Sequence, residues 1–189
     1  DAIAEQYLPE GPDSPVPGSE AGALVAAADK VDNLVGAFLI GEIPSGSKDP
    51  YGLRRAAAGL VRIALERGWD LQADAVLDPA IARFRAQGAD LELPDDDARR
   101  ALSDFLSDRL VHHLGQEGVA QDAVRAALGA SPGGLATVAA WARALHAHRD
   151  DVPLARAGTG ANRCRRIIAG SEQGLAGFSS GGDPDEDAL

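Results

Sequence analysis

Residues 49–68 read DPYGLRRAAAGLVRIALERG, and this stretch decides the fold class. Its apolar residues recur every three or four positions, a spacing that places their side chains on one face of a helix. Asp49 is a good N-cap, and Pro50 suits the first helical position, where its missing N–H costs nothing. Gly68 can end the helix. The buried side of this helix is predicted to consist of Leu53, Ala56, Ala57, Leu60, Val61, Ala64 and Leu65.

The same helical spacing recurs on both sides of this stretch. In residues 21–39 the predicted apolar stripe is Leu24, Val25, Ala28, Val31, Leu34, Val35 and Phe38. Asp29, Asp32, Asn33 and Gly36 fall on another face and form a polar seam. Three aspartates at 95–97 can cap a further helix with the apolar stripe Ala98, Leu102, Phe105, Leu106, Leu110 and Leu114.

No part of the chain alternates apolar and polar residues as a strand would, so we expect an all-α fold. Helices are expected at 119–128, 135–148 and 154–169, joined by Gly and Pro turns. Residues 73–84 form either one helix kinked at Pro79 or two shorter helices. We expect a domain at 1–88, an acidic Pro-containing linker at 89–97, a helical bundle at 98–170 and a mobile acidic Gly/Ser tail at 171–189.

Composition excludes several classes of protein. The net charge of −11 argues against a nucleic-acid binder driven by bulk electrostatics, and we expect no DNA partner, although a local basic patch remains compatible with it. No segment approaches the length of a transmembrane run, so no membrane association is expected. The single cysteine, Cys164, rules out an internal disulfide framework and fits a reducing cytoplasm. Because the chain lacks methionine altogether, we expect it to be part of something longer.

The segment GEIPSGSKDPYGLRR, residues 41–55, contains G-x-x-x-x-G but is not a nucleotide-binding loop. A Walker loop needs lysine before the hydroxyl residue, whereas Ser47 precedes Lys48 here. The loop should also leave a β-strand, yet a helix is predicted before it, and Pro44 removes one amide from the phosphate cradle. The segment is therefore interpreted as a loop that leads into a helix.

No complete catalytic or metal site is evident. The four histidines lack the i, i+4 spacing of two zinc ligands, and Cys164 has no histidine partner near it in sequence. Asp29 lies in ADKVDN, residues 28–33, which resembles the last motif of the HD-domain phosphohydrolase superfamily. One carboxylate cannot make a site that needs several ligands. Asp29 is therefore expected to pack or cap within the polar seam and not to bind a metal.

Three motifs in order carry a more specific resemblance. They are AIAEQYLP at 2–9, AADKVDNLVG at 27–36 and GEIPSGSKDPYGLRR at 41–55. Together they resemble the β subunit of the bacterial two-subunit glycyl-tRNA synthetase. The segment FLSDRL, residues 105–110, is similar to the start of that family's anticodon-binding domain of the DALR type. ANRCRRII, residues 161–168, stands where a basic helix of that domain is expected.

The resemblance implies a fold and a function. Residues 1–88 would be the C-terminal part of a degenerate HD-like helical domain, and 98–170 an anticodon-binding-like domain, with both ends of the protein missing. The implied function is the tRNA-binding part of a glycine–tRNA ligase β subunit, with tRNA(Gly) and the α subunit as partners and a cytoplasmic location. This chain would carry no cofactor and no catalytic residue, because ATP and Mg²⁺ act in the α subunit.

Six basic residues are the candidates for tRNA contact under this interpretation. Arg163, Arg165 and Arg166 concentrate three guanidinium groups on one predicted helix, where Arg163 and Arg166 share a side. Lys48, Arg54 and Arg55 can contact RNA backbone or pair with acidic residues. Two other functions stay open: a metal-dependent phosphohydrolase built on the HD-like part, and a purely structural helical segment that holds subunits together.

Overall fold

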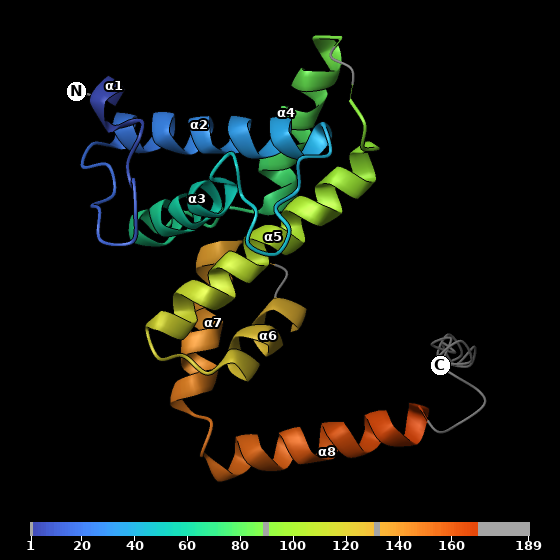
Figure 1. Ribbon diagram of the computed structural model, residues 1–189. Helices are drawn as coiled ribbons and strands as arrows, with labels where there is room; N and C mark the ends of the chain where they lie inside the picture. The colour runs from blue at the N-terminus through green and yellow to red at the C-terminus, as the bar shows by residue number, and fades with distance from the viewer. Residues whose placement is uncertain (1, 89–90, 131–132, 170–189) are drawn as a thin grey trace, which may run out of the picture. The chain divides into compact units, whose positions relative to one another are not determined.

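The computed structural model describes residues 2–88, 91–130 and 133–169, with Arg165 and Ala169 described by their backbone alone. Every regular element in these ranges is an α-helix, which confirms the predicted all-α class (Figure 1). None of these helices combines the length and the apolar character needed to cross a membrane. The helices are α1 (Ala2–Glu5), α2 (Glu20–Leu39), α3 (Leu53–Arg67), α4 (Ala73–Ala86), α5 (Asp95–Gln116), α6 (Gln121–Ala130), α7 (Leu135–Ala147) and α8 (Val152–Ala169).

The chain divides into two compact units, Asp1–His146 and Ala147–Leu189. The expected linker at 89–97 therefore lies inside the first unit, and the expected bundle at 98–170 spans the division between the units. The expected mobile tail at 171–189 lies outside the described residues. Assignment of these segments to HD-like and anticodon-binding domains stays a prediction.

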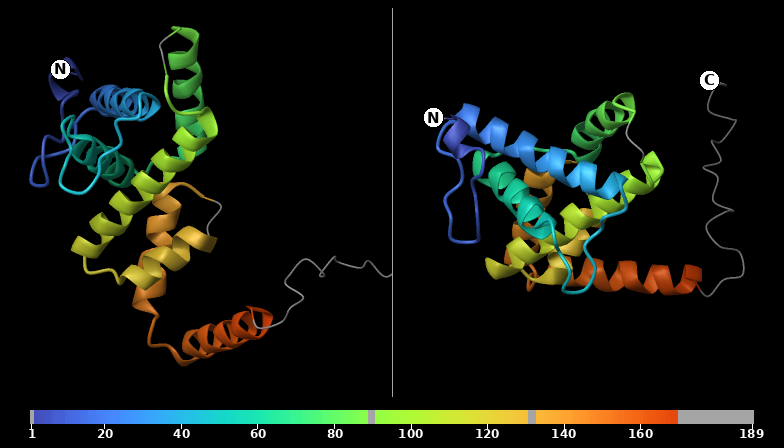
Figure 2. Two further views of the ribbon diagram at one scale, coloured as in Figure 1. Left: turned by 45° about the vertical axis from the view of Figure 1, so that its right-hand side comes forward. Right: turned by 45° about the horizontal axis from the view of Figure 1, so that its top comes forward.

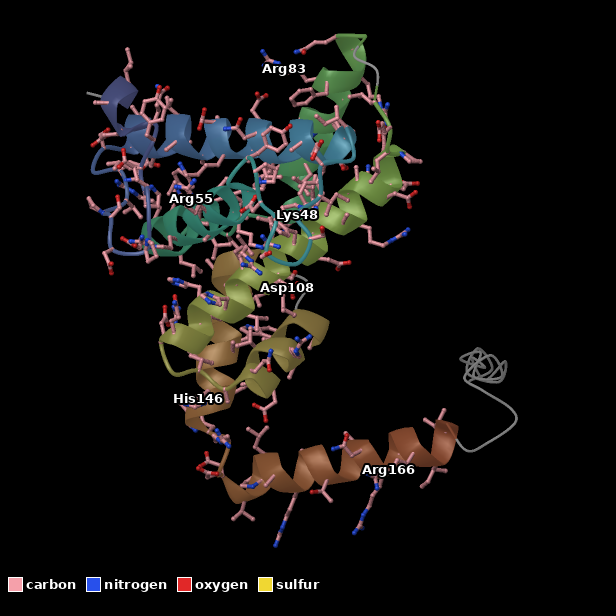
Figure 3. All side chains as sticks on the ribbon, in the orientation of Figure 1. Lys48, Arg55, Arg83, Asp108, His146 and Arg166 are labelled. Atoms are coloured by element: carbon pink, nitrogen blue, oxygen red, sulfur yellow. The ribbon has the colours of Figure 1, made fainter. Side chains whose placement is uncertain are left out.

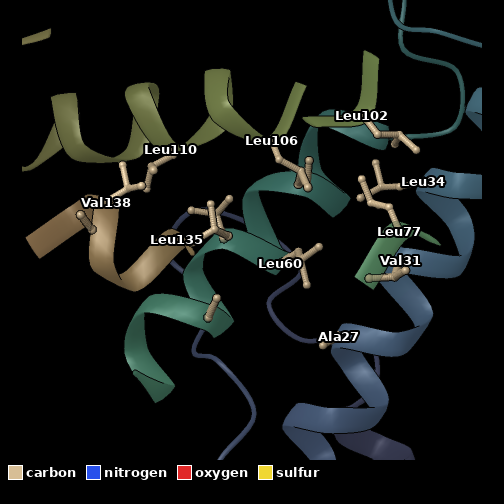
Figure 4. Packing of buried hydrophobic residues seen from close by; sticks show 14 of the residues in the cluster. Ala27, Val31, Leu34, Leu60, Leu77, Leu102, Leu106, Leu110, Leu135 and Val138 are labelled. Atoms are coloured by element: carbon tan, nitrogen blue, oxygen red, sulfur yellow. The ribbon is translucent and has the colours of Figure 1, made fainter. Parts of the chain in front are cut away.

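One apolar core joins α2 to α7 within the first unit (Figure 4). α2 and α3 lie side by side, and α5 packs against both of them as well as against α4 and α6 (Figure 2). The stripe predicted for α5 is confirmed, because five of its residues are buried and Phe105 packs against the core. Leu34, Leu60, Leu106 and Leu135 bring α2, α3, α5 and α7 into the same cluster.

The predicted stripe of α2 is correct only in its C-terminal half. Val31, Leu34, Val35 and Phe38 are buried, and they face the main core. Leu24, Val25 and Ala28 are exposed instead, and Ala23 and Ala26 occupy the inner face against Ile63 of α3. Small side chains on the inner face allow two helices to approach closely. Ala23 and Ala26 therefore face α3, and the larger Leu24 and Val25 face outward.

Helix α3 begins three residues later than the sequence pattern predicted. Its N-cap is Gly52, which has a φ of 65° that favours glycine, and Pro50 lies in the turn before it. Asp49 still serves the helix, because its two carboxylate oxygens accept hydrogen bonds from the N–H groups of Leu53 at 2.8 Å and Arg54 at 3.0 Å. Gly68 ends the helix with a φ of 66°, as predicted.

Glu92 and Leu93, just before α5, are held against the end of α2. The N–H groups of Glu92 and Leu93 both donate to the carbonyl oxygen of Leu39 at the end of α2, at 2.8 and 3.1 Å. Arg85 of α4 pairs with Asp95 at 2.6 Å. Residues 73–84 form part of one helix that contains Pro79, which settles the alternatives left open by the sequence.

Candidate functional site

Three of the six predicted contact residues lie around the start of α3. Arg54 is engaged in the structure, because its guanidinium donates to the carbonyl oxygens of Gly46 at 2.8 Å and Lys48 at 3.2 Å. It therefore braces the loop that precedes its own helix. The side chains of Lys48 and Arg55 are exposed and have no hydrogen-bond or ion-pair partner within the described ranges (Figure 3). Their charges are available to a ligand.

The other three predicted residues lie on α8, in the second unit. Arg163 and Arg166 are exposed and form no ion pair with any described residue, and Arg166 extends outward from the helix (Figure 3). Asp150 and Asp151, which the arginines could have paired with, instead contact Arg149 at 4.0 Å and His148 at 2.9 Å. The side chain of Arg165 lies outside the described part of the chain.

A basic pocket of about 390 Å³ opens between α3, α5 and the loop at residues 9–12. It belongs wholly to the first unit. Four arginines line it against a single carboxylate, in a chain whose net charge is −11. We call it the α3–α5 pocket. Its polar lining consists of Arg54, Arg55, Arg62, Glu66, Arg109, His112, His113 and Gln116.

Arg62 and Arg109 line the α3–α5 pocket in different ways. Arg62 donates to the carbonyl oxygens of Gly11 and Pro12 at 3.1 and 2.9 Å and pairs with Glu66 at 3.2 Å, so it clamps the loop. Arg109 makes no such contacts, and its Nε is buried without any hydrogen-bond partner among the described residues. Its guanidinium carbon instead lies 5.5 Å from the centre of the Phe105 ring.

His113 closes the pocket near the C-terminal end of α5. Burial lowers the pKa of His113, and the positive charges of Arg62 and Arg143 act in the same direction, while Glu117 opposes them. Its Nε2 lies 3.2 Å from Oε1 of Glu117, which also pairs with Arg143 at 2.9 Å. The neighbouring His112 is exposed. Neither histidine belongs to a group of three His, Cys, Asp or Glu side chains within the described ranges.

Asp29 lies on α2, next to the buried Lys30. It is half-buried, and one carboxylate oxygen lies 3.4 Å from the side-chain nitrogen of Asn33. The adjacent Lys30 is buried and donates to the carbonyl oxygen of Leu8 at 2.8 Å. Burial lowers the pKa of Lys30, and Asp29 partly opposes this shift. Among the described residues no three His, Cys, Asp or Glu side chains gather as metal ligands would.

The pocket brings together residues that the sequence analysis did not connect. Arg55 is one of the six predicted contact residues, whereas Arg109 enters the sequence predictions only as part of the FLSDRL motif and Arg62 is not among the six candidates. Arg55 and Arg109 come from α3 and α5, which are neighbours in the fold but separated by α4 in the sequence. The helical periodicity of each segment marks the exposed side without showing which helices meet.

Comparison with known proteins identifies the family. A family model described as "Glycyl-tRNA synthetase beta subunit" matches residues 1–129. Proteins named glycine–tRNA ligase beta subunit are similar to most of the chain. The one from Listeria welshimeri serovar 6b is 37% identical over 147 residues, or 78% of this chain. Those from Ectopseudomonas mendocina and Desulfitobacterium hafniense are 37% identical over 176 residues and 40% identical over 148.

These relatives are much longer than this chain. The matched part covers 21% of the Listeria welshimeri protein and 25% of the Ectopseudomonas mendocina protein. The chain therefore spans about a fifth to a quarter of the length of the curated relatives it matches.

Proposed function

The chain belongs to the glycyl-tRNA synthetase β-subunit family, and on this premise we propose that it supplies tRNA-binding surface to a glycine–tRNA ligase. Its partners are tRNA(Gly) and the α subunit, in the cytoplasm. The attachment of glycine, with its ATP and Mg²⁺, takes place in the α subunit. This chain contributes binding, and it contributes no catalytic residue.

The observation that supports the proposal is a pair of arginines on α8 that pair with no described residue. Arg163 and Arg166 are exposed, and the nearby aspartates at 150 and 151 pair elsewhere. A guanidinium that makes no contact with its own protein gives up little when it binds a phosphate, and its planar fork fits two phosphate oxygens. Their positions three residues apart place both side chains on one side of the helix.

Replacing Arg163 and Arg166 together with glutamine tests the proposal in the assembled enzyme. We expect weaker tRNA(Gly) binding and a flatter dependence of affinity on salt, by a slope of about 0.7 to 0.9 for each phosphate that is no longer neutralised. The measurement is tRNA affinity by filter binding across a salt series.

The matched control is Arg149→Gln, which removes one charge from the same unit at a residue that already pairs with Asp150. This variant should keep the wild-type salt slope. Unchanged tRNA affinity and slope in the double variant, together with a lower melting temperature, would instead assign Arg163 and Arg166 a structural role.

A further inference from the structure

The α3–α5 pocket has the chemistry of an anion site that its own protein leaves incomplete. Its two clamping arginines, Arg54 and Arg62, each donate two hydrogen bonds to loop carbonyls. The other two, Arg55 and Arg109, have donors without partners among the described residues. A buried N–H group without a partner is rare in folded proteins, and it calls for a ligand or another specific explanation.

Arg109 is fixed in place even though it makes no hydrogen bond through Nε to any described residue. Its guanidinium stacks on Phe105, and the Phe105 ring is itself held 5.3 Å from the ring of Phe38 in the core. The face of an aromatic ring attracts a guanidinium and leaves its in-plane N–H donors free. The stack therefore fixes the guanidinium of Arg109 at the wall of the pocket.

We propose that the α3–α5 pocket binds a phosphate group through Arg55 and Arg109. The clamping arginines add positive charge around it without giving up their loop contacts, and Glu66, already paired with Arg62, is the one carboxylate of the lining. The pocket volume of about 390 Å³ falls within the range of sites for small ligands. The choice of phosphate over carboxylate rests on the proposed function, because RNA supplies phosphodiesters.

The first experiment compares Arg55→Gln/Arg109→Gln with the wild type in the assembled enzyme. If the phosphate belongs to tRNA(Gly), affinity should fall by about a hundredfold or more, since each of the two arginines gives at least one charged hydrogen bond and each lost bond weakens binding by about tenfold to a hundredfold. The salt slope should shrink by about 0.7 to 0.9 for the single phosphate. The matched control is Arg83→Gln/Arg100→Gln, which removes two exposed charges from α4 and α5 outside the pocket and should leave both quantities unchanged.

A second measurement separates the sources of the phosphate. Inorganic phosphate should raise the melting temperature of the wild type and not that of the double variant, because only a ligand that binds the native state stabilises it. If the variant loses this rise but binds tRNA normally, the pocket takes a free phosphate compound. If the variant changes neither response, the proposal is overturned. Absence of tRNA(Gly) binding by the wild type would refute the proposed function but leave the phosphate response as an independent test of the pocket.

Two single variants keep the test interpretable if the double variant folds poorly. Arg55→Gln changes an exposed side chain with no described partner, so its melting temperature should match that of the wild type. Arg109→Lys keeps the charge but loses the fork, and it should recover only part of the lost affinity. Full affinity in both variants would contradict the assigned roles.

Discussion

Arg109 shows how one residue can serve binding at the expense of stability. Its buried Nε lacks a hydrogen-bond partner in the described structure, and a buried donor left unpaired costs about 1–3 kcal/mol. The contact with Phe105 recovers about 0.5–2 kcal/mol of that cost. A side chain kept only for packing would be replaced by an apolar residue at little loss. The presence of arginine at this position is consistent with the proposed phosphate site.

His113 should make the fold sensitive to mild acid. Its folded-state pKa lies below the usual 6.5, so in the window between that pKa and 6.5 the unfolded chain binds a proton that the native chain does not. The free energy of unfolding therefore falls as the pH drops through this window, and below it the loss is complete. His113→Gln removes the effect.

The pH prediction is checked by melting temperatures of the wild type and of His113→Gln measured from pH 7.5 to 5. The exposed neighbour His112 provides the control variant, His112→Gln, which should keep the acid sensitivity of the wild type. An identical loss in the wild type and in His113→Gln would refute the assignment to His113.

At the scale of elements, the start of α7 is hydrogen-bonded to Asp70 and Leu71, which follow α3. The N–H of Leu135 donates to the carbonyl oxygen of Leu71 at 3.0 Å, and the N–H of Thr137 donates to a carboxylate oxygen of Asp70 at 3.0 Å. A Cβ atom at Gly134 would lie 2.5 Å from the carbonyl oxygen of Asp70. Only glycine lets these two backbone segments approach so closely.

Gly134→Ala should therefore destabilise the fold by about 1–3 kcal/mol, because a backbone atom cannot move aside as a flexible side chain can. The measurement is the free energy of unfolding by urea. Gly129→Ala is the matched control, since a Cβ atom there meets open space inside α6 and alanine favours a helix by up to about 1 kcal/mol. Equal stability of Gly134→Ala and the wild type would show that the backbone at Asp70 yields easily and that glycine is not required at this position.

The sequence predicts the helices better than it predicts their contacts. The buried side of α5 follows from spacing alone, and so does most of that of α3, where the prediction omits Ile63, which is fully buried against α2. The prediction for the N-terminal half of α2 is wrong because hydrophobicity alone favours burial of Leu24 over Ala23. Close packing against Ile63 requires the smaller side chain on the inner face, so Ala23 is buried and Leu24 is exposed. The site shows the same limit: Arg55 carries a motif signal, but its proximity to Arg109 depends on how α3 and α5 pack.

At the scale of the whole molecule, basic side chains are concentrated at two places in a chain that is acidic as a whole. The chain has a net charge of −11, yet basic side chains with no partner among the described residues occur in the α3–α5 pocket and on α8. Because the net negative charge of the protein repels the negatively charged RNA, tRNA binding should depend on contacts with these basic side chains and not on a long-range attraction to the whole protein. The two basic surfaces belong to different units, and we expect tRNA(Gly) to use both of them.

The central claim is that this chain contributes tRNA-binding surface, and the most direct test is to map where bound RNA contacts it. tRNA(Gly) carrying photoactivatable nucleotides would be cross-linked to the assembled enzyme, and the attached peptides would be identified by mass spectrometry. We predict cross-links within both residues 48–55 and residues 156–166, and their disappearance when unlabelled tRNA(Gly) competes. Specific cross-links that all fall elsewhere in the enzyme, with none in residues 1–189, would contradict the claim.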